Sequence, residues 1–245
     1  MTAILDAPPQ VTPKPAKASL RAALSATIVG LGAGQQALFA GLTWEDFRYA
    51  AAECENSDRK LRITYDRGSL CLMPTSSLHE VWKKAIAMLL EQYAIESRIR
   101  MYGLGNLTIS HELLDRGFSP DECYYIQNVQ AVVDRKGKLD LESDPPPDLS
   151  IEIEVTRSAL PRLPVMAAFS VPEVWRFDGT TISILLLRTD GTYEKSTVSR
   201  AFPRLPIPEI EQLLQGAIEL DHVSTAIAFR DWLRANPRVL AGASS

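Results

Sequence analysis

One stretch of the chain decides the fold: Asp148-Leu149-Ser150-Ile151-Glu152-Ile153-Glu154-Val155. Apolar and polar residues alternate along it, and successive side chains of a β-strand point to opposite faces of a sheet. We therefore expect a strand whose isoleucines and valine face a core, while Glu152 and Glu154 share the other face. Two carboxylates on one face repel each other, and burial would add several kcal/mol per ion. A bound divalent cation removes both penalties, whereas a solvated sheet face is the alternative explanation.

Strands and helices mix irregularly on both sides of this strand. Residues 61–65 and 69–73 alternate in polarity around Asp66-Arg67-Gly68, which predicts a β-hairpin. A helix is expected after Ser77, because Ser77 and Glu80 have the spacing of a capping box. The mixture predicts an α+β fold, in which a mixed β-sheet is flanked by helices and the hairpin lies near the N-terminus, rather than a doubly wound sheet. Further strands are expected at 98–109, 123–126, 173–177, 181–187 and 192–199, and further helices at 158–169, 210–216 and 225–235.

Composition suggests how the chain is divided. Residues 1–40 carry four prolines and many small side chains, so we expect a disordered N-terminal tail. One folded domain is expected over residues 41–216, followed by a C-terminal helical extension over 217–245. The apolar stretch at 23–42 is interrupted by glycines, so we expect no membrane helix. The first nine residues contain no Lys or Arg, so we expect no signal peptide either.

Charge and cysteine content narrow the functional classes. The 245-residue chain has a net charge of −4 and 46% hydrophobic residues. This composition supports a real core and argues against a surface covered by nucleic acid, although a local basic patch stays compatible with it. The three cysteines are far apart and form no Cys/His cluster. We therefore expect no zinc site, and free thiols suit the reducing cytoplasm.

A second acidic position completes a pattern. Asp121 follows Pro120 and directly precedes a tyrosine-rich predicted strand. Alone, an aspartate at such a place is an ordinary loop residue. Together with the later Glu-x-Glu of Glu152 and Glu154, it resembles the PD…(D/E)xK arrangement of metal-dependent nucleases.

Four motifs in order extend this resemblance: LMPTSSLHE at 72–80, GFSPDECYYI at 117–126, PPDLSIEIEVT at 146–156 and VPEVWRFDG at 171–179. Over roughly residues 42–216 the chain resembles the Uma-two family, bacterial proteins of the restriction-endonuclease-like superfamily. The resemblance implies a restriction-endonuclease-like fold and hydrolysis of phosphodiester bonds. It also implies Mg²⁺ or Mn²⁺ as the cofactor and DNA as the partner.

The resemblance assigns roles to individual residues. It makes Asp121 and Glu152 metal ligands, with the carbonyl of Ile153 as a third ligand. A cation held there polarises the scissile phosphate and lowers the pKa of a bound water. Glu154 stands where the superfamily has a lysine, and becomes a candidate ligand of a second metal ion. Arg162 lies where many members have a helical lysine; it stays protonated and is no general base, but it can hold a phosphate.

The first helix adds two candidates that also have structural explanations. Glu80 is either the acid of the capping box or an acid that reaches the metal. His79 is either a residue of the surface or capping turn, or a catalytic group. The loop at 134–138 is basic, but such loops are usually only solvated. The full set of catalytic candidates is Asp121, Glu152, Glu154, Arg162, Glu80 and His79, and the expected DNA contacts are Lys83, Lys84, Arg157 and Arg162.

Three functions are compatible with these patterns. The first is a metal-dependent endonuclease acting on DNA. The second is a catalytically degenerate nuclease-fold module that binds nucleic acid or a protein partner, because the superfamily lysine is replaced by Glu154. The third is a structural protein whose acids are merely solvated. By analogy with nucleases that cut both strands, we also expect a homodimer.

Overall fold

The computed structural model describes residues 10–12, 17–32, 34–136, 138–140, 142–154, 158–217 and 221–240. The chain divides into two compact units, each assembled from separate segments. The N-terminal unit comprises Met1–Thr75, Thr108–Ser119 and Arg157–Val165; the C-terminal unit comprises Ser76–Leu107, Pro120–Thr156 and Met166–Ser245. Each unit contains one six-stranded sheet with helices packed on it.

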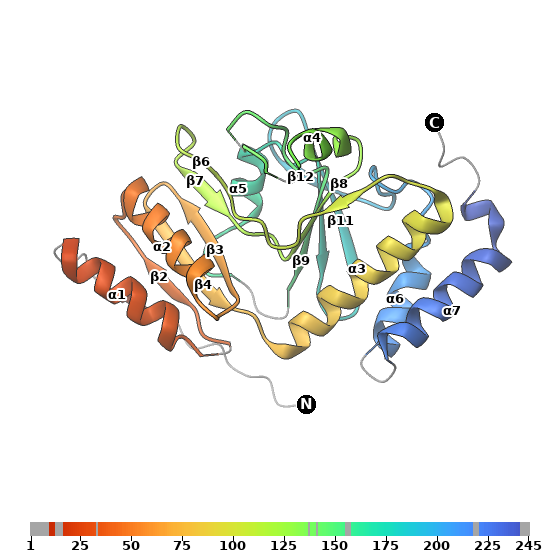
Figure 1. The fold of residues 1–245 in the computed structure, drawn as a ribbon, viewed down its shortest axis with the longest axis horizontal. Helices are drawn as coiled ribbons and strands as arrows, with labels where there is room; N and C mark the ends of the chain where they lie inside the picture. The colour runs from red at the N-terminus through yellow and green to blue at the C-terminus, as the bar shows by residue number, and fades with distance from the viewer. Residues whose placement is uncertain are drawn as a thin grey trace. The chain divides into compact units, whose positions relative to one another are not determined.

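The N-terminal unit is built on a sheet with the strand order β1-β2-β4-β3-β7-β6. Figure 1 labels β2, β4, β3, β7 and β6 of this sheet. β1 and β2 are parallel and the other neighbours are antiparallel. Helices α1 and α2 contribute part of its apolar core, in which Phe47 of α2 stacks on Tyr65 of β3 with ring centroids 4.7 Å apart. Its elements are β1 (Gln10–Thr12), α1 (Lys17–Gly30), β2 (Ala37–Phe39), α2 (Trp44–Asn56), β3 (Leu61–Asp66), β4 (Ser69–Pro74), β6 (Ile109–His111) and β7 (Arg116–Phe118).

The expected extent of the N-terminal tail is wrong for the described residues from Lys17 onward. Helix α1 buries Leu20, Leu24 and Ile28, each at most 2% exposed. Their spacing of four residues places them along one helical face, which packs into the core of this unit. Because alanine favours helices, the small residues that suggested a tail support this helix instead.

The hairpin prediction is confirmed. Strands β3 and β4 pair from Leu61↔Pro74 to Asp66↔Ser69, which leaves a two-residue turn of Arg67 and Gly68. Both turn residues have positive φ, 45° and 86°, as a type I′ turn requires.

The C-terminal unit contains the strand expected in the stretch 148–155, which the structure forms over Leu149–Ile153. Its sheet has the order β12-β11-β10-β9-β8-β5, with β9 and β10 parallel and the other neighbours antiparallel. The α+β class is confirmed, but the strands form two mixed sheets rather than one. The elements are α3 (Ser77–Ser97), β5 (Tyr102–Gly103), β8 (Glu122–Tyr125), α4 (Val129–Asp134), β9 (Leu149–Ile153), β10 (Glu173–Phe177), β11 (Ile182–Leu187), β12 (Tyr193–Ser196), α6 (Ile207–Gly216), α7 (His222–Ala235) and the 3₁₀ helix η1 (Pro237–Val239), while α5 (Leu163–Ala168) runs across the boundary between the units.

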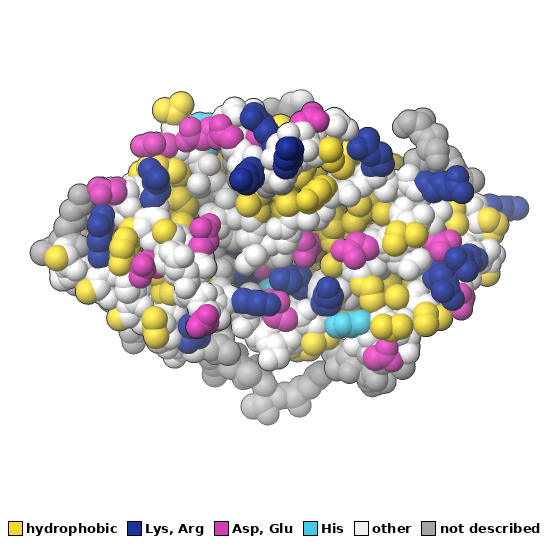
Figure 2. Space-filling model, in the orientation of Figure 1, with side chains coloured by type: hydrophobic (Ala, Val, Ile, Leu, Met, Phe, Trp, Pro, Cys, Tyr) yellow, Lys and Arg dark blue, Asp and Glu magenta, His cyan; other side chains and the backbone are white. Residues whose placement is uncertain are grey.

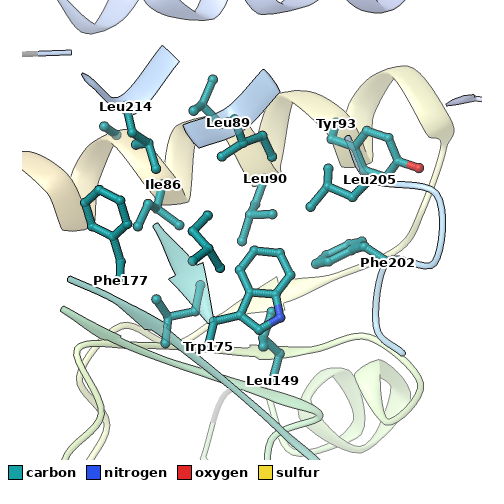
Figure 3. Packing of buried hydrophobic residues seen from close by; sticks show 14 of the residues in the cluster. Ile86, Leu89, Leu90, Tyr93, Leu149, Trp175, Phe177, Phe202, Leu205 and Leu214 are labelled. Atoms are coloured by element: carbon teal, nitrogen blue, oxygen red, sulfur yellow. The ribbon is translucent and has the colours of Figure 1, made fainter. Parts of the chain in front are cut away.

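One face of this second sheet carries the apolar core. The apolar residues of β9 point toward α3, as the alternation in the sequence predicted. Trp82 of α3 meets Phe177 of β10 edge to face, with centroids 5.5 Å apart. Each fully buried side chain of this size contributes about 1.5–3 kcal/mol. Figure 3 shows Leu149, Trp175 and Phe177 of the sheet facing Ile86, Leu89, Leu90 and Tyr93 of α3.

Helices α6 and α7 belong to the same unit. α7 packs against α3 and buries Phe229 and Leu233 completely. The boundary expected at residue 216 therefore does not coincide with the end of this compact unit. None of the helices in the described part of the chain combines the length and apolarity that a membrane span requires.

Candidate active site

Strands β8 and β9 bring Asp121 and Glu152 to neighbouring positions. Glu122 pairs with Ile151, so one further step in the same antiparallel register places Asp121 beside Glu152. The amide of Asp121 donates to the Ile151 carbonyl at 3.2 Å. Glu152 alternates with Ile151 and Ile153, which belong to the α3 core, so its side chain points to the opposite face of the sheet, while Asp121 directly precedes β8.

Both acids are buried: Asp121 is 1% exposed and Glu152 is 2% exposed. The alternative of a solvated face is therefore wrong for these two side chains. Asp121 Oδ2 accepts a hydrogen bond from the Ile153 amide at 2.7 Å. Two adjacent buried carboxylates carry a desolvation cost that only hydrogen bonds and positive charge can offset.

The start of helix α3 differs from the capping box that the sequence predicted. The N-cap is Ser76, whose Oγ accepts from the His79 amide at 3.2 Å. Because the helix starts one residue earlier than expected, His79 and not Glu80 occupies the third helical position. Glu80 is therefore not the acid of a capping box. Its carboxylate lies 3.2 Å from Lys83 Nζ instead.

His79 lies between two carboxylates. Its Nε2 is 3.0 Å from Asp121 Oδ2, and its Nδ1 is 3.6 Å from Glu80 Oε1. The ring is 4% exposed, which excludes a surface position. Neither ring nitrogen meets the angles of a hydrogen bond to any described residue, so the 3.0 Å approach is an ion-pair distance without hydrogen-bond geometry. The structure thus brings His79 and Asp121 together.

Glu154 is held by a residue that sequence reasoning missed. Arg176 of β10 forms an ion pair with Glu154 through Nη2. Arg176 is also the register partner of Glu152 in the parallel β9–β10 pair. The signal in the sequence was a single charge inside the apolar strand Val174-Trp175-Arg176-Phe177. Its meaning depends on β10 being the neighbour of β9, which the sequence does not reveal.

Arg162 belongs to the N-terminal unit, where it has structural partners. Its guanidinium donates to the Ser119 carbonyl at 2.6 Å, to Thr64 Oγ1 and, more weakly, to the Ile63 carbonyl at 3.4 Å. These bonds tie β3 to the chain that follows β7. A site role for Arg162 stays a prediction.

The expected DNA contacts of the first helix occupy different environments. Lys84 is exposed, whereas Lys83 is partly buried beside Glu80. Burial raises the pKa of Glu122, and the nearby Lys83 ammonium opposes that shift. Arg157 lies outside the described residues, so the structure does not bear on it.

The residues present fit a metal ion that has few protein ligands. Asp121 and Glu152 are adjacent, and a strand residue directs its N–H and C=O to the same side. Since the Ile153 amide points to Asp121, the Ile153 carbonyl points toward the same strand. Mg²⁺ is commonly held by one or two carboxylates with waters. Among the described residues, no three His, Cys, Asp or Glu side chains form a metal-binding group. The expected convergence of three carboxylates is therefore not present, because Glu154 pairs with Arg176.

A family model and a solved structure match the chain. The model of the Uma2 family, described as "Putative restriction endonuclease", matches residues 44–222. No curated protein matches the chain. Among solved structures, it is similar to a putative nuclease belonging to DUF820 from Anabaena variabilis, at 16% identity and a TM-score of 0.44, covering 76% of this chain and 99% of that one. The family match spans Asp121, Glu152 and Arg176.

Proposed function

The chain belongs to the putative restriction endonuclease family Uma2, and on that premise we propose that it is a metal-dependent nuclease hydrolysing phosphodiester bonds in DNA. One observation supports this most: two buried carboxylates, Asp121 and Glu152, stand side by side on adjacent strands. Buried acids with perturbing neighbours cluster at functional sites, because their folding cost otherwise selects against them.

We assign a proposed role to each residue of this site. Asp121, Glu152 and the Ile153 carbonyl would hold Mg²⁺ or Mn²⁺, which when bound activates a water and polarises the phosphate. The Ile153 amide fixes the Asp121 carboxylate through its 2.7 Å hydrogen bond. His79, on the first turn of α3, lies 3.0 Å from the same carboxylate and would limit its movement. Glu80 places a second carboxylate beside His79, and Glu154 reaches an ion only after leaving Arg176.

Contact with DNA is proposed to be local. Figure 2 shows Lys and Arg side chains interspersed with Asp and Glu over the displayed face, rather than a continuous basic surface. Lys84, exposed on α3, and Lys83 beside it are proposed phosphate contacts, together with Arg157 and Arg162. The free cysteines fit a cytoplasmic location. Homodimerisation stays a proposal by analogy, which gel filtration tests.

The test is nicking of supercoiled plasmid in a series of Mg²⁺, Mn²⁺, Ca²⁺ and EDTA. Glu152→Gln and Asp121→Asn should each lower the rate by at least about 100-fold, since each removes a charge that positions the cation. Glu194→Gln is the matched control, because Glu194 is an exposed glutamate of the same sheet. Cleavage that persists unchanged in Glu152→Gln would refute the proposal and point to a contaminating nuclease.

A second candidate is a degenerate module that binds DNA without cutting it. The observation that favours it is the glutamate at position 154, paired with Arg176 where the superfamily has a lysine. Binding of a labelled duplex without nicking under any of the metals would select this reading over the enzyme.

A further inference from the structure

Arg176 has more hydrogen-bond donors than the described residues accept. Its Nη2 is engaged by Glu154, while its Nε is buried without a hydrogen-bond partner among the described residues. A guanidinium carries five N–H donors in a planar fork. The side chain is 34% exposed, so part of that fork reaches the surface.

Arg176 lies next to the acidic pair formed by Asp121 and Glu152. In the parallel β9–β10 ladder it is opposite Glu152, and residues in register share a face of the sheet. Glu154 follows two residues after Glu152 in the chain, so the guanidinium lies along a row of carboxylates. A cation there attracts anions to a surface that would otherwise repel them.

A purely structural role explains only part of this arrangement. An ion pair between partly exposed side chains contributes only about 0–1 kcal/mol. Burying Nε without an acceptor costs free energy that this pair does not clearly offset. Phosphate oxygens are the acceptors that match the planar fork, because they accept two parallel N–H bonds.

We propose that Arg176 binds a backbone phosphate of DNA beside the acidic pair, and that Glu154 occupies its guanidinium when DNA is absent. The inference rests on the proposed function and deepens it, because it assigns the substrate's phosphate to a named residue. The Glu154 carboxylate takes the place of phosphate oxygens, so DNA has to displace it. Glu154 then acts against DNA binding rather than for it.

Four variants of the full chain separate this proposal from simple charge neutralisation. Arg176→Gln removes the phosphate contact, and Glu154→Gln removes the competing carboxylate. The double variant Glu154→Gln/Arg176→Gln removes both, and Arg176→Lys keeps the charge without the fork. Arg188→Gln is the matched control, since Arg188 is an arginine of the same unit that also pairs with carboxylates, those of Asp190 and Glu194.

The measurement is fluorescence anisotropy of a labelled DNA duplex, in EDTA, from about 50 to 200 mM salt. We expect Glu154→Gln to bind about fivefold more tightly, because the carboxylate that competes with phosphate for the Arg176 guanidinium is removed. Arg176→Gln should bind about tenfold more weakly, and its slope of log affinity against log salt should fall by about 0.9. Arg176→Lys should keep the salt slope, and Arg188→Gln should match wild type.

The double variant decides between the two explanations. If Arg176 contacts phosphate, the double variant stays as weak as Arg176→Gln. If Arg176 only neutralises Glu154, the double variant recovers wild-type affinity, which overturns the proposal. An unchanged salt slope in Arg176→Gln, or wild-type protein that does not bind the duplex at low salt, overturns it as well. Melting curves check that each variant is folded. If Arg176→Gln does not fold, the proposal is tested by two other results: tighter DNA binding by Glu154→Gln and an unchanged salt slope for Arg176→Lys.

The assay also separates this inference from the nuclease proposal. Binding is read without divalent metal, so it does not require cleavage. Salt-dependent binding through Arg176 without nicking under any metal would leave the inference standing and refute the enzyme. Nicking that requires Glu152, in a protein whose cleavage rate and DNA affinity do not change in Arg176→Gln, would support the nuclease and refute this inference.

Discussion

A buried glutamate outside the candidate site allows a sharp test of the C-terminal unit. Glu173, at the start of β10, is fully buried. Its Oε1 accepts from the indole of Trp175 at 2.5 Å, and its Oε2 accepts from the amides of Arg200 and Ala201, both at 2.8 Å. One side chain therefore ties β10 to the segment before α6, and no basic side chain among the described residues forms an ion pair with it.

Replacement of Glu173 by Gln should be destabilising despite the equal size. An amide has only one acceptor oxygen, so either the indole or the two backbone amides then face an NH₂ group. One buried donor left unsatisfied costs about 1–3 kcal/mol, and each remaining bond weakens by about 1 kcal/mol when its acceptor loses charge. The expected loss is about 3 kcal/mol, which lowers the melting temperature by about 6–12 °C in a chain of this size.

The assay is thermal unfolding followed by tryptophan fluorescence and by circular dichroism. Three of the four tryptophans, Trp82, Trp175 and Trp232, belong to this unit, so fluorescence reports mainly on it. Two probes are needed because a chain with two compact units need not unfold in one step. Glu194→Gln on the surface of the same sheet should change stability by less than about 0.5 kcal/mol. If Glu173→Gln is equally mild, the Glu173 carboxylate is not the acceptor of these three hydrogen bonds, which refutes the prediction.

Three further predictions concern the site and its surroundings. Millimolar Mg²⁺ should raise the melting temperature of the wild type by a few degrees and leave Glu152→Gln unchanged, because an ion that binds only the folded state stabilises it; an equal rise in both proteins would contradict the proposed ligand. Burial raises the pKa of Glu122 against the opposing charge of Lys83, so the folded state binds a proton more readily than the unfolded state and stability falls as pH rises through that range. Glu122→Gln should therefore melt higher than wild type at pH 7, an advantage that disappears below about pH 4; a gain independent of pH would refute this. Gly179→Ala should cost about 1–3 kcal/mol in urea unfolding, because φ is 97° there and the new methyl carbon would lie 3.1 Å from the Trp82 ring; an unaffected midpoint would show that the turn adapts.

The buried acids Asp121 and Glu152 lie near a positively charged side chain. Asp121 and Glu152 are buried side by side, while Arg176 supplies the positive charge on the same face. That charge is already shared with Glu154. The proposed phosphate contact of Arg176 therefore requires that this ion pair opens.

Local sequence patterns were sufficient to predict most individual strands and helices. The alternation in residues 149–153 and the turn residues Arg67 and Gly68 defined β9 and the hairpin, because strand periodicity and positive φ are properties of short segments. The tail prediction failed for α1, since the proline-rich start outweighed the four-residue spacing of its leucines. The capping box was displaced by one residue, because Ser76 and Ser77 are chemically equivalent and only packing selects between them.

The sequence by itself determined which residues are acidic, which strands they begin or occupy, and the family to which the chain belongs. Only the tertiary structure decided that β10 lies beside β9 in parallel, which sets Arg176 next to Glu152 and pairs it with Glu154. It also decided that His79 approaches Asp121 from a helix more than forty residues earlier in the chain. Strand order and register depend on burial summed over the whole sheet, and no local segment contains that information.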